Sequence, residues 1–174
     1  MRPQGLTSTA ADPFDSEMFA KRNDRYLTPL PLIQALGIFD LDPCGAPGHP
    51  SASTVWTPEE VGDGLSLPWF GRVWLNPPYG RKISAWVDRL FQHGSGIALI
   101  PATPDTALWQ RRVLAEAHAV LFVRGRIRYA NAERPANHPS ALVAVSSTDA
   151  AALISSGLGH VMTQPSDLSQ GGGE

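Results

Sequence analysis

Val73-Trp74-Leu75-Asn76-Pro77-Pro78-Tyr79-Gly80 is a stretch in which an apolar run gives way to an amide, two prolines, an aromatic ring and a glycine. The first three residues predict a buried β-strand, because β-branched and aromatic side chains fit a pleated surface. The prolines must end that strand, since neither has an N–H for the ladder. Asn76 is therefore expected at the carboxyl end of a strand, the edge where open α/β sheets bind their ligands.

The polar half of this stretch suits the recognition of a nucleobase amine. An exocyclic amine needs acceptors for two hydrogens, and the Asn76 side-chain oxygen and the Pro77 carbonyl could provide them. Tyr79 offers a ring face on which a base removed from its stack could lie. The alternative interpretation is a proline-rich turn that follows a core strand and has no chemical role.

Length and composition restrict the class of protein. The chain has 174 residues, the size of one domain, and 43% of them are hydrophobic. Its single cysteine, Cys44, excludes an intramolecular disulfide and a Cys-rich zinc site. No apolar run approaches the ~18 residues that span a bilayer, and the N-terminus lacks the pattern of a signal peptide. We expect a cytoplasmic protein without membrane association.

Basic residues are concentrated in two places although the net charge is −2. Arg81 and Lys82 follow the proline stretch, and a second group interleaves arginines with Tyr129 between residues 124 and 139. Such local patches could hold nucleic-acid phosphates on a slightly acidic protein. An exposed hairpin with solvated arginines and no partner would have the same sequence.

Strands and helices are predicted to alternate along residues 23–163, which we interpret as a single domain between a flexible arm (1–22) and a disordered tail (164–174). Thr28 is expected to cap a first helix that begins at Pro29, and further helices are expected at 83–93 and 106–117. Strands are expected at 38–41, 53–57, 73–75, 97–101, 119–123 and 140–146, with Ile127 and Tyr129 suited to a strand of their own. This order predicts a parallel, doubly wound α/β sheet closed by an antiparallel hairpin near the C-terminus.

Three motifs together resemble those of a known enzyme family. Asn76 to Tyr79 is similar to the Asn-Pro-Pro-Tyr motif of S-adenosylmethionine-dependent amino-methyltransferases. Upstream lie a Tyr-x-Thr-Pro segment (26–29) and an Asp-Pro-Cys-Gly loop (42–45). Their order over about residues 24–146 resembles the phage-type, Dam-like DNA N6-adenine methyltransferases. The glycine loop departs from the family pattern, because Pro47 follows Ala46 and a His-Pro pair replaces the usual aromatic.

The resemblance implies a Rossmann-like methyltransferase sheet, mostly parallel, that transfers a methyl group from S-adenosylmethionine to N6 of a flipped adenine in DNA, without a metal. It also implies DNA methylation in a phage or restriction-modification setting, by a monomer or a homodimer. Its motif places the catalytic site at Asn76, Pro77, Pro78 and Tyr79. The implied cofactor contacts are Tyr26, Thr28, Asp42, Pro43, Cys44, Gly45, Ala46 and Asp63, and the implied DNA contacts are Arg81, Lys82, Arg124, Arg126, Arg128 and Tyr129.

Other functions remain open at this point. Asn-Pro-Pro-Tyr also occurs in methyltransferases that act on protein glutamine or on an RNA base. A non-catalytic DNA-binding module could keep the same fold, and the atypical glycine loop favours that alternative. Asp63 lies between glycines, where an Asp is usually a turn residue, so a turn role and a cofactor role are equally compatible with the sequence.

Overall fold

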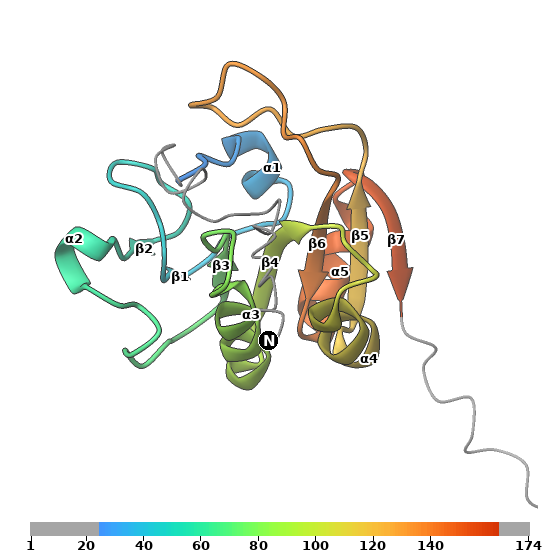
Figure 1. The fold of residues 1–174 in the computed structure, drawn as a ribbon, viewed down its shortest axis with the longest axis horizontal. Coiled ribbons are helices and arrows are strands. Elements are labelled where there is room, and N and C mark those ends of the chain that lie inside the picture. The colour runs from blue at the N-terminus through green and yellow to red at the C-terminus, as the bar shows by residue number, and fades with distance from the viewer. Residues whose placement is uncertain (1–24, 164–174) are drawn as a thin grey trace, which may run out of the picture.

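A computed structural model describes residues 25–163 of the chain, as helices and strands arranged around one sheet (Figure 1). The arm and the tail expected at 1–22 and 164–174 lie outside the described residues. The elements in chain order are α1 (Leu30–Gln34), β1 (Leu41–Asp42), β2 (Thr54–Val55), α2 (Pro58–Val61), β3 (Val73–Leu75), α3 (Ile83–His93), β4 (Gly96–Pro101), η1 (Trp109–Val113), α4 (Leu114–Glu116), β5 (Ala119–Val123), β6 (Ser140–Ala144), α5 (Ser147–Ser155) and β7 (Gly159–Thr163).

The sheet has seven strands in the order β2-β1-β3-β4-β6-β5-β7. Strands β2, β1, β3 and β4 are parallel neighbours, whereas β6 runs antiparallel between β4 and β5, and β7 runs antiparallel to β5. The predicted α/β class is confirmed, as a mixed sheet that is parallel at one end and antiparallel elsewhere. The antiparallel part is larger than the sequence led us to expect, because β7 extends it beyond the predicted hairpin.

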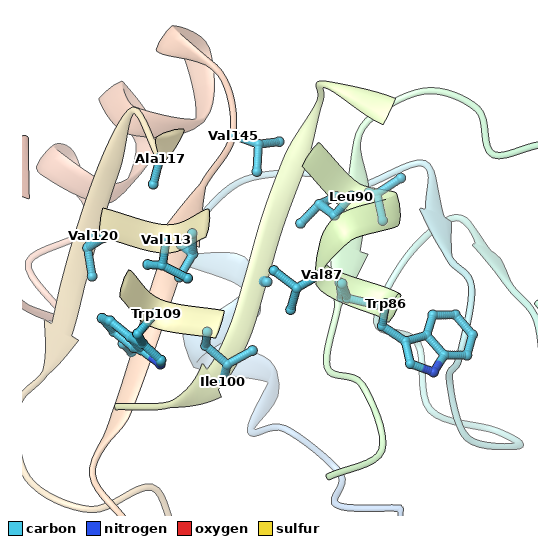
Figure 2. Packing of buried hydrophobic residues seen from close by; sticks show 14 of the residues in the cluster. Trp86, Val87, Leu90, Ile100, Trp109, Val113, Ala117, Val120 and Val145 are labelled. Atoms are coloured by element: carbon cyan, nitrogen blue, oxygen red, sulfur yellow. The ribbon is translucent and has the colours of Figure 1, made fainter. Parts of the chain in front are cut away.

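Both faces of the sheet are covered, as the unbroken apolar pattern of β4 requires. On one face, Trp86 and Leu90 of α3 and Trp109 of η1 pack over the strands (Figure 2). On the other face lie α1, α5 and the buried side chains of Ile127 and Tyr129. Within residues 25–163, no helix is long and apolar enough to cross a membrane.

Several local predictions are wrong. Ile127 and Tyr129 form no strand, because their alternation reflects two side chains buried from an irregular segment. Thr28 does not cap α1, since no side chain caps that helix. The helix expected at 106–117 is present, but it contains an unpredicted π-helical turn at Trp109–Val113. Helix α5 was not predicted, although the hydroxyl of Ser146, its N-cap residue, accepts from the Asp149 N–H.

An ion pair holds the edge of the sheet where β3 and β4 begin. Arg72 Nε donates to Asp149 Oδ1 at 2.7 Å, and Nη1 donates to the carbonyls of Leu36 and Ile38. The other Asp149 oxygen accepts from the Gly96 N–H at 2.7 Å. Asp149, which is 1% exposed, therefore links α5 to the start of β4 directly, and through Arg72 to the start of β3 and to the residues after α1.

Asp149→Ala should lower the free energy of unfolding by about 3–5 kcal/mol, because it leaves the largely buried Arg72 without its partner. Urea unfolding at pH 7 measures this change. Asp105→Ala, which removes an exposed carboxylate, is the control and should stay within about 0.5 kcal/mol of the wild type. Equal, small changes in both variants would show that the ion pair contributes little.

Candidate active site

A cavity of about 310 Å³ opens at the edge of the sheet where β1 and β3 end. This is the crevice that an α/β sheet forms where neighbouring strands lead to loops in opposite directions. Its volume lies at the lower end of the range of small-molecule sites. Predicted site residues that line it are Tyr26, Thr28, Asp42, Pro43, Cys44, Gly45, Ala46, Asp63, Asn76, Pro77, Pro78 and Lys82.

The Asn76 side chain has a defined orientation in this cavity. Its amide nitrogen Nδ2 donates to the Tyr26 carbonyl at 3.0 Å and to the Thr28 hydroxyl at 3.2 Å. A backbone carbonyl can only accept, so the amide nitrogen must face it and the amide oxygen Oδ1 must point away. Among residues 25–163, Oδ1 has no hydrogen-bond donor, so it is free to accept from a ligand.

The segment 25–28, which supplies these acceptors, is held by contacts with His49, Glu59 and Asn131 that the sequence did not predict. His49 donates through Nε2 to the Thr28 carbonyl at 2.9 Å, and Arg25 forms an ion pair with Glu59 at 2.6 Å. The Asn131 amide accepts from the Leu27 N–H at 2.9 Å and donates to the Arg25 carbonyl at 2.7 Å. No local sequence signal could identify these contacts, because each joins residues far apart in the chain.

Asp42 is a buried carboxylate at the end of β1, 3% exposed. It accepts from the Ser51 hydroxyl and, at 3.1 Å, from the Cys44 N–H. Burial raises the pKa of Asp42 to about 6, and these two hydrogen bonds only partly oppose the shift. A cationic group placed beside Asp42 would therefore recover part of the cost of keeping its charge.

Cys44 connects the loop after β1 with the motif after β3. Its thiol donates to the Asn76 backbone carbonyl with an Sγ–O distance of 3.4 Å. Burial, with Asp42 nearby, raises the pKa of Cys44 well above its ordinary value, while the contact with Asn76 opposes the shift. The thiol therefore stays neutral, and it acts as a hydrogen-bond donor rather than as a nucleophile.

An acidic residue, Asp63, and an aromatic residue, Trp86, both line the cavity. One carboxylate oxygen of Asp63 accepts from the Leu65 N–H at 3.0 Å, so Asp63 stabilises the turn, as one of the two interpretations of the sequence predicted. Asp63 also lines the cavity. Trp86, a core residue of α3 by its helical spacing, presents part of its ring here and stacks on Trp69 with a centroid distance of 6.1 Å. The wall thus combines an apolar surface with a carboxylate.

All three tyrosines of the chain meet beside the cavity. The Tyr79 and Tyr129 hydroxyls are 2.9 Å apart, and the Tyr26 and Tyr129 ring centroids are 4.8 Å apart. Tyr129 is buried at 3% exposure, whereas Tyr79 is 36% exposed. Burial, followed by the neighbouring Tyr129, raises the pKa of Tyr79 above its ordinary value. Tyr79 is thus a neutral ring with an accessible side, fixed at its hydroxyl by a buried partner.

Exposed cations follow two of the strands that end at this edge of the sheet. Arg81 and Lys82 follow the motif, and β5, whose direction matches that of β3, ends where Arg124 begins. Among the residues that the structure describes, none of the predicted DNA-contacting cations forms a salt bridge, and Arg126 alone of them makes a side-chain hydrogen bond, to the Asn137 carbonyl at 2.6 Å. These cations are Arg81, Lys82, Arg124, Arg126 and Arg128.

The pKa of Asp42 predicts an unusual dependence of stability on pH. Between its ordinary value of 3.8 and about 6, the folded protein binds a proton that the unfolded chain releases. The contribution of Asp42 is therefore fully present below pH 3.8, and it is lost as pH rises to 6, by on the order of 3 kcal/mol. Asp42→Asn, which resembles the neutral form, should gain stability relative to the wild type over this window. Urea unfolding at pH 4 and pH 7.5 measures the gain, and parallel profiles would contradict it.

A comparison with protein families identifies the family of this chain. Residues 15–147 match the model of the family described as DNA N-6-adenine-methyltransferase (Dam). A search among curated proteins finds no match. The matched range covers most of the chain and contains both the glycine loop and the Asn-Pro-Pro-Tyr motif. The chain therefore belongs to the Dam family of DNA N6-adenine methyltransferases.

Proposed function

We propose that this protein transfers a methyl group from S-adenosylmethionine to the N6 amine of an adenine flipped out of DNA, on a Rossmann-like methyltransferase sheet. The observation that carries the proposal is the orientation of the Asn76 amide. Both of its hydrogens are held by the segment 25–28, and its oxygen is left to accept from an amine. The family supports DNA adenine methylation in general, and this geometry supports the atomic roles.

In the proposed reaction, Asn76 Oδ1 and the Pro77 carbonyl accept the two hydrogens of N6. These contacts direct the nitrogen lone pair into the cavity and make it more available. S-adenosylmethionine, when bound, supplies an electrophilic methyl group on sulfur. Tyr79 stacks on the base, whose removal from the duplex costs a few kcal/mol. Pro78 stiffens the loop that connects Pro77 to Tyr79. Orientation provides much of the rate enhancement, and the surplus N6 proton leaves to water.

The residues of the cavity fit the chemistry of this cofactor. S-adenosylmethionine carries a cationic amino group, and Asp42 is a buried carboxylate that forms no salt bridge with any residue of 25–163. Its adenine needs an apolar surface and an acceptor for an amine, and Trp86 and Asp63 line the wall together. Tyr26, Thr28 and the 43–46 backbone complete the proposed cofactor contacts.

The cations at this edge support DNA as the substrate. Arg81, Lys82 and the arginines of residues 124–128 are exposed and form no salt bridge within residues 25–163, so they can pair with phosphates. Tyr129, which we first expected to reach DNA, is buried, and we now propose that it acts through Tyr79. Transfer to a glutamine side chain or an RNA base remains the alternative, and a side-by-side assay on the three substrates separates them.

Asn76→Ala should lower the methylation rate by about 100-fold or more, because it removes a preorganised acceptor at the reacting nitrogen. Binding of S-adenosylmethionine should be largely retained. The rate is measured in a single turnover on adenine-containing DNA, and binding by calorimetry. Equal losses of binding and rate would assign Asn76 to cofactor binding instead.

Binding of S-adenosylmethionine should release a proton near pH 6. Asp42 has a pKa of about 6, and a cationic amino group beside it would lower that pKa and expel the bound proton. The binding enthalpy should therefore depend on the ionisation enthalpy of the buffer at pH 6, but not at pH 8. Asp42→Asn is the matched control and should show no buffer dependence, and buffer-independent binding by the wild type at pH 6 would place the amino group elsewhere.

A further inference from the structure

The segment between β5 and β6 (residues 124–139) contacts the site at two points. Tyr129 places its hydroxyl 2.9 Å from that of Tyr79. Two residues later, the Asn131 side chain bonds the backbone of Arg25 and Leu27. One short stretch of this segment therefore touches both the stacking ring and the segment that orients Asn76.

The Asn131 side-chain amide bonds the backbone of Arg25 and Leu27 with one donor and one acceptor, as a neighbouring β-strand would. Its oxygen accepts from the Leu27 N–H at 2.9 Å, and its nitrogen donates to the Arg25 carbonyl at 2.7 Å. A third bond, from the Ala130 N–H to the Leu27 carbonyl at 2.9 Å, lies beside them. These bonds fix Arg25 and Leu27 on both sides of Tyr26.

Tyr26 connects the residues bonded by Asn131 to the Asn76 side chain. Its carbonyl accepts from Asn76 Nδ2 at 3.0 Å, so a shift of Tyr26 would let the Asn76 amide rotate. Its ring lies against Tyr129, with centroids 4.8 Å apart. Asn131 makes none of the direct contacts proposed for the target base, and its hydrogen bonds lie one residue on either side of the Tyr26 carbonyl that holds Asn76.

We infer that Tyr129 and Asn131 are positioning residues of the methyl-transfer site: Asn131 fixes the Tyr26 carbonyl that orients Asn76, and Tyr129 fixes Tyr79. The inference rests on the proposed function. The same segment carries Arg124, Arg126 and Arg128. DNA bound by these arginines would therefore contact the segment that positions Asn76 and Tyr79. A purely structural role predicts lower stability instead, without a selective effect on the chemical step.

The test compares Asn131→Asp with Asn137→Asp. Both changes add one negative charge to the same basic segment at an exposed position, so any loss of phosphate attraction is common to both. Only the first removes the N–H donor to the Arg25 carbonyl and places a carboxylate against it. The single-turnover rate at saturating DNA and cofactor should fall by about tenfold or more in Asn131→Asp, with both dissociation constants within about twofold of those of Asn137→Asp. Equal rates in the two variants would overturn the role of Asn131.

A second measurement uses the free protein and needs no activity. Hydrogen exchange at the Asn76 side-chain amide, followed by NMR, should be faster in Asn131→Asp and unchanged in Asn137→Asp. Unchanged exchange in both would overturn the inference even if the enzyme is active. A wild type that methylates no substrate would instead contradict the proposed function, and the exchange measurement would still decide whether Asn131 holds Asn76.

Tyr129 is tested by a double-mutant cycle with Tyr79. Tyr79→Phe and Tyr129→Phe each remove one end of the same hydrogen bond and keep both rings. If that bond positions Tyr79, the double variant should be no slower in single turnover than the slower single variant. Single-variant losses that multiply in the double variant, or single variants as fast as the wild type, would overturn the role of Tyr129.

Discussion

The site depends on the two hydrogen bonds from the Asn76 amide nitrogen to the segment 25–28. They determine which end of the amide faces the cavity, and without them the oxygen and the nitrogen could exchange places by rotation. In the proposed reaction, an amide with its nitrogen toward the base would present hydrogens to an amine that also carries hydrogens. The stiff Pro-Pro turn fixes where Asn76 lies, and the segment 25–28 fixes how it is turned.

A second constraint arises from the neighbouring strand. Asp42 ends β1 and Asn76 follows β3, and parallel pairing of these strands places both side chains at one edge. The carboxylate is kept where burial disfavours its charge. A buried ionisable group in a cleft is common at functional sites, and here it offers a place for a cationic group. If Asp42 holds the cationic group of the cofactor as proposed, stability and cofactor binding have opposite requirements there, since the neutral form favours the first and the charged form favours the second.

Much of this arrangement could be predicted from the sequence, because it depends on local rules. Prolines end β3 after Leu75, and the alternation of apolar strands with helices gives the α/β class. The contacts that complete the site could not be predicted in this way. Asn131 and His49 bond backbone atoms of residues distant in the chain, and nothing in their neighbours marks them. Tyr129 was misplaced for a related reason, since alternating apolar residues fit an exposed strand as well as a buried irregular segment.

The most direct test of the account is to identify the methylated atom. DNA is incubated with the protein and S-adenosylmethionine that carries a labelled methyl group, then digested to nucleosides and analysed by mass spectrometry. The expected product is labelled N6-methyl-2′-deoxyadenosine, and Asn76→Ala should form it about 100-fold more slowly or slower still. Label on another base, or DNA and cofactor binding without any transfer by the wild type, would contradict it.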